Sequence, residues 1–267
     1  MIPEPFDLFA VRYAVHAGRS SSENFIGGDL HEAGSDLAYF VWIARRSDRL
    51  FLIDTGFGPE AAAQRGRTLL DTPARLLTKL DIAADRIEDV ILTHLHYDHA
   101  GTIEAFPNAR FHVQDAEAAF ATGRCMCHPF LRQAYDVEDA VAFLRRLYSG
   151  RVIFHDGEAE ICSGLSVHHV GGHSGGLQVV RVWTRRGWVV LASDASHLYA
   201  NMREARPFPI VHNVERMLEG YRLIYRLAES PQHVIPGHDP LVMSYYPPLS
   251  AELSETVFRL DEEPVER

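Results

Sequence analysis

The sequence predicts a layered α/β sandwich with its short loops gathered at one edge, and three observations support this fold class. Strand-like runs followed by helix-like segments occur in the first half of the chain and again in the second, as in packed sheets and helices. The 267 residues are 46% hydrophobic and 23% charged, which allows a sizeable core without disulfides. Histidine and aspartate residues cluster where predicted strands end. We expect one domain over residues 1–267, with a loosely packed tail from about residue 247.

Strand-like runs organise the first third of the chain. Leu8–Val15 carries large apolar side chains at alternate positions. Two further apolar runs, Leu37–Ala44 and Leu50–Ile53, are separated by the polar residues 45–49, which predicts a β-hairpin. Residues 17–35 are rich in Gly and Ser and lack periodicity, so we predict a long loop there, and loops of this length are often functional.

The rest of the chain alternates short strands with helices. A helix is expected over 72–80, because Thr72 suits the N-cap and Pro73 the first turn. Residues 213–228 place apolar side chains along one side of a helix. The other predicted helices are 115–121 and 137–148, and the other predicted strands are 87–93, 110–113, 152–154, 165–170, 177–183, 188–192 and 234–235.

Charge and cysteine content disfavour several classes of function. The chain carries 36 acidic and 26 basic residues, a net charge of −10, which disfavours binding to the phosphate backbone of nucleic acids. Three cysteines give no disulfide framework and suit a reducing compartment. The start of the sequence lacks a signal-peptide pattern, and the longest apolar run, 37–44, is far shorter than the ~18 residues that cross a bilayer. We therefore expect a cytoplasmic protein with neither a nucleic-acid partner nor a membrane partner.

Four candidate metal ligands follow the predicted strand 87–93. His94 and His96 are two residues apart, so in an extended chain their side chains point the same way and suit one ion. Asp98 and His99 follow a turn and can face a second ion. Imidazole and carboxylate groups suit Zn²⁺, and also Mn²⁺, Fe²⁺ or Co²⁺. A polar loop with surface histidines is the alternative, but so many ligands directly after an apolar strand disfavour it.

Three later residues extend this set. His173 lies in a glycine-rich segment, Asp194 follows the predicted strand 188–192, and His238 follows the predicted strand 234–235. Each is flanked by small residues, which let the backbone approach an ion closely. Taken singly, each is more typical of a hydrogen-bonded loop residue. Together with the first four, they indicate a metal site.

The pattern His94-x-His96-x-Asp98-His99, followed by His173, Asp194 and His238, resembles the metallo-β-lactamase superfamily over about residues 8–240. The resemblance implies an αββα sandwich with a dinuclear metal site at one edge of its two sheets. It also implies that Asp54, in the strand-end motif Asp54-Thr55-Gly56, orients ligand histidines, and a structural turn aspartate is the alternative. The implied ligands are His94, His96 and His173 for the first metal, Asp98, His99 and His238 for the second, and Asp194 as a bridge.

Within the superfamily, the chain resembles the N-acyl-homoserine-lactone lactonase-like branch. The resemblance rests on the ligand set, the segment 194–196, the long loop 17–35 and the chain length. It implies that two Zn²⁺ ions per chain share and acidify one water, and that the metal-bridging hydroxide opens the lactone ring. Asp98 is then part of the catalytic machinery. The expected partner is a small lactone or ester, and a homodimer is compatible with the sequence.

The sequence departs from this branch at the position expected to hold the acid. Lactonases of the branch commonly carry a tyrosine three residues after the bridging aspartate, whereas this chain has His197 there and Tyr199 two residues further on. Either side chain is a candidate proton donor or oxyanion stabiliser, since the pKa of an unperturbed histidine is near 6.5. A solvent-exposed loop histidine is the alternative for His197.

The long loop is the predicted wall of the substrate pocket. Its apolar residues suit an acyl chain or an aromatic ring, and its histidine supplies a polar contact. A packed loop with exposed polar groups is the alternative. A helical insertion near the pocket is expected around Cys125 and Cys127, which lack the second cysteine pair of a zinc knuckle. The predicted substrate-binding residues are Phe25, Ile26, Leu30 and His31.

Three other functions compete with lactone hydrolysis. The same site could cleave another cyclic ester, an aryl ester or a thioester. A mononuclear iron oxygenase, including a sulfur dioxygenase, is disfavoured by the complete second set of ligands, and a binding protein with a degenerate site is disfavoured by the complete set as a whole. Flavodiiron proteins carry Glu where this chain has His96, and the tail is acidic where glyoxalase II-type enzymes are basic.

Overall fold

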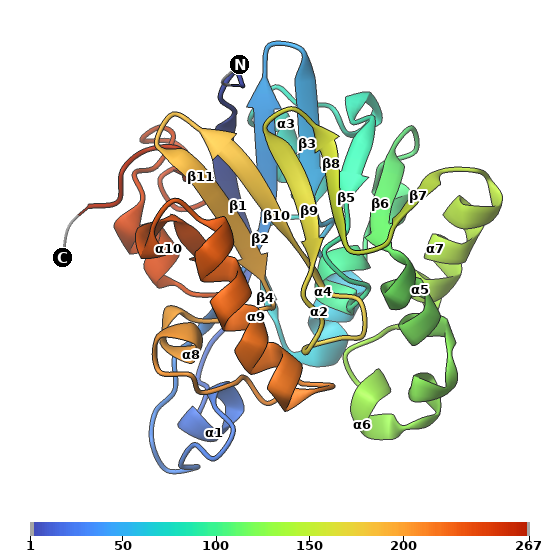
Figure 1. Ribbon diagram of the computed structural model, residues 1–267, viewed down its shortest axis with the longest axis vertical. Coiled ribbons are helices and arrows are strands. Elements are labelled where there is room, and N and C mark those ends of the chain that lie inside the picture. The colour runs from blue at the N-terminus through green and yellow to red at the C-terminus, as the bar shows by residue number, and fades with distance from the viewer. Residues whose placement is uncertain (1–2, 266–267) are drawn as a thin grey trace.

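The protein is a mixed α/β sandwich of two sheets, seen in a computed structural model that describes residues 3–265 (Figure 1). The first sheet has the order β13-β1-β2-β3-β5-β6-β7, with β4 paired to β1, and the second has the order β12-β11-β10-β9-β8. This confirms the predicted fold class. The strands of the first sheet are β1 (Asp7–His16), β2 (Leu37–Arg46), β3 (Arg49–Ile53), β4 (Thr68–Leu69), β5 (Asp89–Ile91), β6 (Arg110–Gln114), β7 (Val152–His155) and β13 (Val257–Arg259). Those of the second are β8 (Glu158–Cys162), β9 (Leu165–His169), β10 (Gln178–Thr184), β11 (Gly187–Ser193) and β12 (Val234–Pro236).

The helices follow or connect these strands. The α-helices are α1 (Ser21–Asn24), α2 (Pro59–Arg65), α3 (Pro73–Thr78), α4 (Tyr97–Ala100), α5 (Asp115–Thr122), α6 (Pro129–Arg132), α7 (Val137–Tyr148), α8 (Tyr199–Arg203), α9 (Val214–Leu227) and α10 (Leu241–Tyr245). Short 3-10 turns are η1 (Ala84–Arg86), η2 (Ile103–Ala105), η3 (Arg124–Cys127) and η4 (Pro231–His233). None of the helices in residues 3–265 combines the length and apolar character needed to cross a bilayer.

Parallel strands bring the functional loops to one edge. β3, β5, β6 and β7 pair in parallel, and β11 pairs in parallel with β12. The carboxyl ends of parallel strands lie at the same edge of a sheet, so the loops after β5, β11 and β12 converge. The apolar run in β2, buried over its first eight residues, forms the centre of the core with Trp42 fully buried. The predicted hairpin and most of the predicted strands are thereby confirmed.

The predicted amphipathic helices are also confirmed. α9 buries Met217, Tyr221 and Ile224 on one side, and the Asn213 side chain caps its first turn by accepting a hydrogen bond from the backbone N–H of Arg216. α7 matches the predicted range 137–148. α7 and α9 form where apolar residues recur at helical spacing and a residue that can cap the helix precedes them.

The carboxyl-terminal tail differs from its prediction. Residues from about 247 were expected to pack loosely, but β13 adds an edge strand to β1, and Phe258 and Leu260 are buried. The acidic composition suggested exposure, yet the buried carboxylate of Asp261 pairs with Arg259 at 2.7 Å and also with Arg185. A buried charge with two such partners is compatible with a packed tail.

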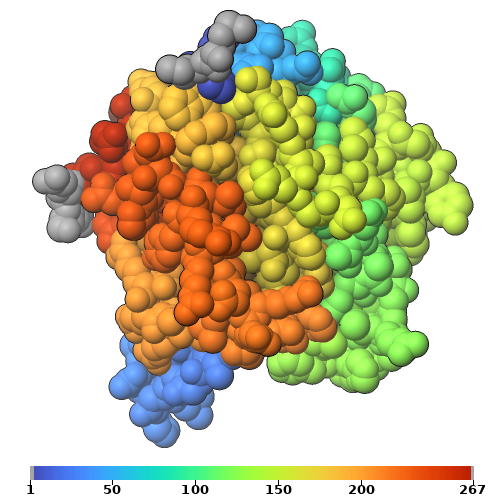
Figure 2. Space-filling model, in the orientation of Figure 1, coloured from blue at the N-terminus to red at the C-terminus, as the bar shows by residue number. Residues whose placement is uncertain are grey.

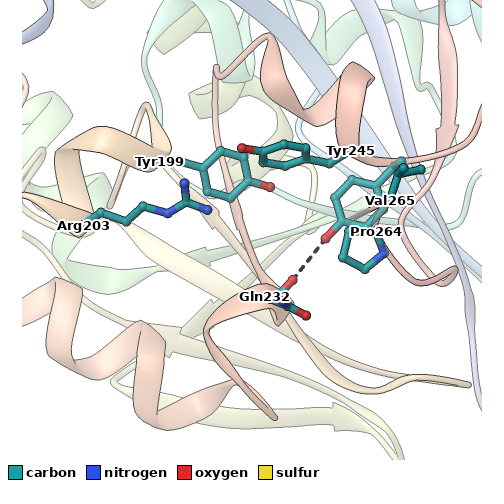
Figure 3. Close-up of a pocket in the computed structure, with 7 residues that line it drawn as sticks. Tyr199, Arg203, Gln232, Tyr245, Pro264 and Val265 are labelled. Carbon is teal, nitrogen blue, oxygen red and sulfur yellow. Dashed lines mark hydrogen bonds between the residues drawn. The ribbon is translucent and has the colours of Figure 1, made fainter. Parts of the chain in front are cut away.

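Two cavities open on the surface near the second half of the chain. One has a volume of about 500 Å³ and lies beside α8 and α10, against the tail, with Tyr199 and Tyr245 among its lining residues (Figure 3). The other has a volume of about 420 Å³ and lies at the converging loops. The segment containing α1 protrudes from the body of the molecule (Figures 1 and 2).

Candidate metal centre and active site

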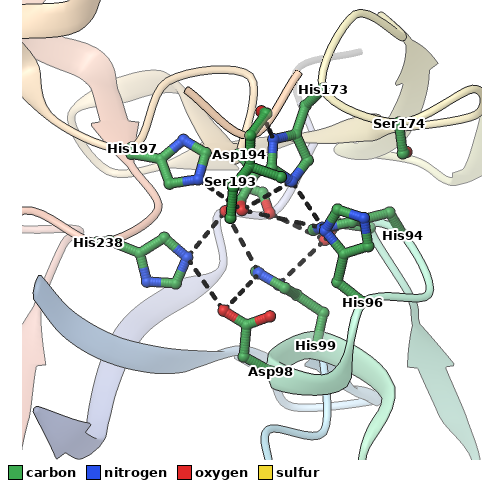
Figure 4. Close-up of polar contacts among 12 residues, drawn as sticks. His94, His96, Asp98, His99, His173, Ser174, Ser193, Asp194, His197 and His238 are labelled. Carbon is green, nitrogen blue, oxygen red and sulfur yellow. Dashed lines mark hydrogen bonds and ion pairs between the residues drawn. The ribbon is translucent and has the colours of Figure 1, made fainter. Parts of the chain in front are cut away.

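Seven predicted ligands meet at the edge where the parallel strands end. His94, His96, Asp98 and His99 follow β5, with Asp98 and His99 on the short helix α4. His173, Asp194 and His238 follow β9, β11 and β12 respectively. All seven are buried. Figure 4 shows their side chains pointing toward one another around Asp194.

Three imidazoles converge on one side of this cluster. His94 Nε2 lies 3.0 Å from His96 Nδ1, and His173 Nε2 lies 2.9 Å from the same atom. Burial lowers the pKa of His94 and of His96 well below the usual value, so both are neutral at neutral pH. Neutral imidazoles that aim ring nitrogens at one point present lone pairs to it, which is the arrangement of a metal site.

The Asp194 carboxylate separates this set from a second one. Its Oδ2 lies 3.1 Å from His173 Nε2, whereas its Oδ1 lies 2.9 Å from His238 Nε2 and 3.3 Å from His99 Nε2. Asp98 Oδ2 faces His99 and His238 at 3.6 and 3.7 Å. The two oxygens of one carboxylate therefore face two different groups of ligands, each compact enough to hold an ion.

Unpartnered atoms in this cluster support a metal site. His99 Nε2 and Asp194 Oδ1 are buried and have no hydrogen-bond partner among the described residues. Buried polar atoms without partners are costly, and a bound cation would satisfy both. Donor types, convergence and unsatisfied atoms thus all fit divalent metal ions.

Hydrogen bonds on the far side of the rings fix their orientation. His173 Nδ1 donates to the carbonyl oxygen of Ile210 at 2.8 Å, and His238 Nδ1 donates to that of Ala38 at 3.1 Å. A neutral ring that donates from Nδ1 carries no proton on Nε2, which is then available to bind a metal. The sequence predicted the residues at the site but carried no signal for these two carbonyl groups.

Asp54 performs the orienting role expected for it. Its Oδ2 lies 2.7 Å from His99 Nδ1, and its Oδ1 accepts a hydrogen bond from the backbone N–H of Thr93 at 2.7 Å. Asp54 and Ser193 both have positive φ, 62° and 45°, which is unfavourable for residues other than glycine. The hydrogen bonds of the Asp54 carboxylate offset this cost and hold His99 in place.

Glu117 is a functional residue that the sequence analysis missed. Its buried carboxylate accepts hydrogen bonds from the backbone N–H of Leu95 at 3.0 Å and the Tyr135 hydroxyl at 2.9 Å. It also accepts from the Ser174 hydroxyl and the backbone N–H of Gly176. Glu117 therefore ties the loop of His94 and His96 to the loop of His173. The helical pattern of 115–121 gave no sign that this glutamate points inward.

Gly176 and Gly237 permit close packing around the site. A Cβ at Gly176 would lie 2.0 Å from the backbone nitrogen of Glu117, and one at Gly237 would lie 2.8 Å from Asp194 Oδ1. Neither position has room for a side chain. The expectation that small residues let the backbone approach the site is confirmed at these two positions.

His197 lies at the site, whereas Tyr199 does not. His197 Nε2 lies 3.0 Å from Asp194 Oδ2, and its ring stacks on Phe208 with 3.6 Å between the ring centroids. Its Nδ1 is buried and finds no hydrogen-bond partner within residues 3–265. Burial lowers the pKa of His197 to about 3, so the imidazole is neutral at neutral pH. The Tyr199 side chain lines the cavity beside the tail instead (Figure 3), because α8 begins there and turns the ring away. The structure therefore does not bring the Tyr199 side chain to the predicted metal ligands.

The predicted substrate-binding residues of the long loop are not among the residues that line the site cavity. The side chains that line the site cavity from this segment belong to Arg19, Ser22 and Glu23. Leu30 is 70% exposed and Ile26 is 45% exposed, and neither lines the cavity. Phe25 packs under the guanidinium of Arg206, and His31 is exposed. The loop does form a wall, but α1 and Arg19, two positions before it, supply the contacts.

A helical insertion and a second loop complete the cavity. η3 and α6 form the insertion expected around Cys125 and Cys127, both of which are free thiols. Phe130, Gln133 and Ala134 line the cavity from this insertion. From the opposite side, Phe208 and Ile210 contribute apolar surface. The cavity thus has both apolar and polar side chains on its walls and the predicted metal ligands at its floor, as small-molecule sites usually combine apolar walls with a few polar groups.

The fold and this site define a metallo-hydrolase with a divalent metal centre. A sequence model described as the metallo-beta-lactamase superfamily matches residues 34–238. The chain belongs to the metallo-β-lactamase superfamily, and the fold class predicted from the ligand pattern is confirmed.

Relatives of known name point to one branch of the superfamily. The chain is 29% identical to the N-acyl homoserine lactonase AiiB of Rhizobium rhizogenes, over 76% of this chain and 80% of that one. It is 26% identical to the probable metallo-hydrolase Rv2300c of Mycobacterium tuberculosis, over 73% of this chain and 68% of that one. The resemblance to the lactonase-like branch is thereby confirmed.

Solved structures share the fold. A quorum-quenching N-acyl homoserine lactone lactonase superposes with a TM-score of 0.72 at 22% identity, over 90% of this chain and 94% of that one. AidC, described as a dizinc quorum-quenching lactonase, superposes with a TM-score of 0.69 at 16% identity, over 100% of this chain and 98% of that one. At these identities the likeness concerns the fold.

Proposed function

We propose that this protein is a dinuclear metal-dependent hydrolase that opens lactone rings, with N-acyl-homoserine lactones as the first candidate substrates. The observation that carries the proposal is the position of Asp194, whose two carboxylate oxygens face two separate sets of ligands. One carboxylate between two sets is the arrangement expected of a bridging ligand. The lactonase relatives at 26–29% identity support the substrate class.

The proposed ligand roles follow from the atoms that face each other. We assign His94, His96 and His173 to one ion and Asp98, His99 and His238 to the other, with Asp194 between them. Imidazole nitrogen and carboxylate oxygen are a common ligand set of Zn²⁺, and we propose two Zn²⁺ per chain. When bound, two such ions polarise an ester carbonyl and lower the pKa of water toward 7, which makes hydroxide available at neutral pH.

We propose that His197 stabilises the oxygen that gains charge as the ring opens. The neutral imidazole carries one N–H, and the ring is held flat against Phe208 at the edge of the cavity. A hydrogen-bond donor fixed in a buried site costs little reorganisation when charge develops in front of it. The same histidine replaces the tyrosine that relatives of this branch commonly carry.

The second ligand set disfavours a mononuclear iron oxygenase. Asp98, His99 and His238 bring their donor atoms within 4.8 Å of one another and are all buried. A mononuclear centre would leave this buried carboxylate and its two imidazoles without a role.

Proton release on a substrate panel tests the proposal. The zinc-loaded protein, with chelated protein as the control, is mixed with N-acyl-homoserine lactones, simple lactones, aryl esters and thioesters in a pH-stat. We expect metal-dependent acid release from the lactones, with the ring-opened acid identified by NMR. Acid release from aryl esters or thioesters alone would mean that the substrate is one of these esters and not a lactone. No acid release from any substrate would reject the proposed hydrolase activity.

A further inference from the structure

Two arginines stand at the mouth of the site cavity with their charges unpaired. Arg65 is the last residue of α2, and Arg67 follows two positions later. Gly66 between them adopts a left-handed conformation, with φ of 64°, and ends the helix. This turn brings both arginines to the lining of the same cavity.

Both guanidinium groups gather around Tyr97. Arg65 lies over its ring, 3.9 Å from the centroid, and Arg67 Nε donates to its hydroxyl at 3.2 Å. Tyr97 directly precedes the ligand Asp98 on α4, so the two charges lie one aromatic side chain away from the metal centre. The remaining hydrogen bonds of the two guanidinium groups go to neutral carbonyl oxygens, those of Arg65, Gln133 and Tyr135.

The two charges have no carboxylate partner within 4.0 Å in residues 3–265. Arg19, which also lines the cavity, differs because Glu23 lies 3.9 Å from it. Burial is the main cause that lowers the pKa of His16 to about 4, and the positive charges of Arg67 and Arg19 lower it further. A chain with a net charge of −10 thus keeps unpaired cations at the mouth of its active site.

We infer that the substrate of this site carries a carboxylate, placed at the end of a short chain away from the bond that is cleaved, and that Arg65 and Arg67 bind it. The inference rests on the proposed lactone hydrolysis and narrows its substrate class. Guanidinium groups match a carboxylate by paired hydrogen bonds, and half-buried cations attract an anion more strongly than exposed ones. Held by Tyr97 and by backbone carbonyls, the two groups are already oriented.

The surrounding walls limit the chain that joins the carboxylate to the ring. Tyr97, Phe130 and Ala134 line the cavity on the side of the two arginines. This surface suits a few methylene groups, with the charge at the far end. A neutral acyl chain of the same length would leave both guanidinium groups without an anion.

A matched pair of lactones tests the inference. N-succinyl-homoserine lactone carries the terminal carboxylate, and its methyl ester has the same chain without the charge. We expect kcat/KM for the charged lactone to exceed that for the ester by about tenfold or more, and the preference to fall as salt is added. Arg67→Gln and Arg65→Gln should each reduce the preference, whereas Arg67→Lys should retain part of it.

Two controls separate folding from binding. Arg49→Gln alters an exposed arginine outside the site cavity, on the turn between β2 and β3, and should leave the preference unchanged. Metal content of each variant, measured by mass spectrometry, verifies an intact centre. Equal kcat/KM values for the two lactones in the wild-type protein would overturn the inference and leave lactone hydrolysis standing.

Binding measurements distinguish failure of the inference from failure of the proposed function. Calorimetric titration measures the binding of succinate, with dimethyl succinate as the uncharged control. We expect the double variant Arg65→Gln/Arg67→Gln to bind succinate about tenfold or more weakly than the wild-type protein does. If no lactone were hydrolysed but the wild-type protein still bound succinate more tightly than the double variant, the proposed hydrolase activity would be rejected and the anion site would be retained. Equal binding of succinate by the wild-type protein and the double variant would reject the anion site.

Discussion

The floor and the mouth of the site cavity are built in different ways. The floor consists of side chains at the ends of β5, β9, β11 and β12, and hydrogen bonds to neighbouring segments orient His99, His173 and His238 among them. The mouth consists of α1, the η3–α6 insertion and the turn after α2, whose side chains are partly exposed. Residues at the floor therefore determine the reaction. Residues at the mouth can change which substrate binds without altering the predicted metal ligands.

The largest effect is expected from Asp194→Ala at the floor. Without the carboxylate between the two ligand sets, the variant should lose bound metal. Its kcat should fall by more than roughly 10²–10³-fold, which is the usual cost of losing one polar contact to a transition state. Metal content and proton release measure both effects. Asp261→Ala, which removes another buried carboxylate, should lower stability but keep the metal. Full activity of Asp194→Ala would rule out this metal centre.

His197→Phe should separate catalysis from metal binding. Phenylalanine retains the stacking on Phe208 but cannot donate a hydrogen bond. We expect kcat to fall by about 10²-fold with metal content unchanged, since a positioned donor or acid contributes ~10²–10⁴-fold. Wild-type rates in this variant would assign the role to water, because Tyr199 lines another cavity.

Glu117→Gln tests whether the floor depends on the network behind it. An amide cannot accept all four hydrogen bonds that the carboxylate accepts, so at least one buried donor loses its partner. Metal affinity should fall about 10- to 100-fold, as it does when other groups that orient ligands are removed. Competition with a chelator measures this affinity, and Glu138→Gln on the exposed side of α7 is the matched control. Equal metal retention by the two variants would leave Glu117 with a structural role only.

Two exposed apolar residues, Phe130 and Leu30, test which part of the surface contacts the substrate. Phe130 is 60% exposed and lines the cavity, whereas Leu30 is 70% exposed and does not. Phe130→Ala should raise KM about three- to tenfold through lost apolar contact, and Leu30→Ala should leave KM unchanged. Steady-state kinetics on one lactone compare them. A larger effect from Leu30→Ala would mean that the long loop folds over the substrate.

A carboxylate behind the floor should make stability depend on pH. Burial, together with Asp136, raises the pKa of Asp139 to about 7 from an ordinary value of 3.8. The folded state therefore binds this proton more tightly than the unfolded state, and the stability that it contributes below pH 4 is lost as the pH rises through 7.

Asp139→Asn removes this penalty. The variant should unfold with a free energy higher than the wild type by about 1 kcal/mol at pH 8, after allowance for solvent screening of a half-buried group. The difference should vanish near pH 4. Urea unfolding at the two pH values measures it, and an equal difference at both would contradict the assignment to Asp139.

The predicted metal ligands at the floor could be found from the sequence because they lie close together in it or directly follow apolar strands. His94, His96, Asp98 and His99 lie within six consecutive positions after an apolar strand, and strand ends meet at one edge. Asp194 and His238 follow the same rule. Glu117 escaped notice because its partners are backbone N–H groups and hydroxyls from distant segments, which no spacing reveals.

The mouth was less predictable because its conformation depends on long-range packing. Residues 17–35 were expected to contact substrate through their apolar side chains, but Ile26 and Leu30 point into solvent. The chain folds there into α1, held by Asn201 of α8, whose amide donates to the carbonyl oxygen of Asn24 at 3.0 Å. The tail was misjudged for a similar reason, since Arg185 and Arg259 compensate the buried Asp261.

Titration of the metal-free protein with Zn²⁺ tests the central claim most directly. Proton release from an N-acyl-homoserine lactone is followed as metal is added in fractions of an equivalent per chain. We expect hydrolysis to rise until two equivalents are bound and then to stay constant. Maximal activity at one equivalent, or no hydrolysis at any amount of metal, would contradict a dinuclear lactone hydrolase.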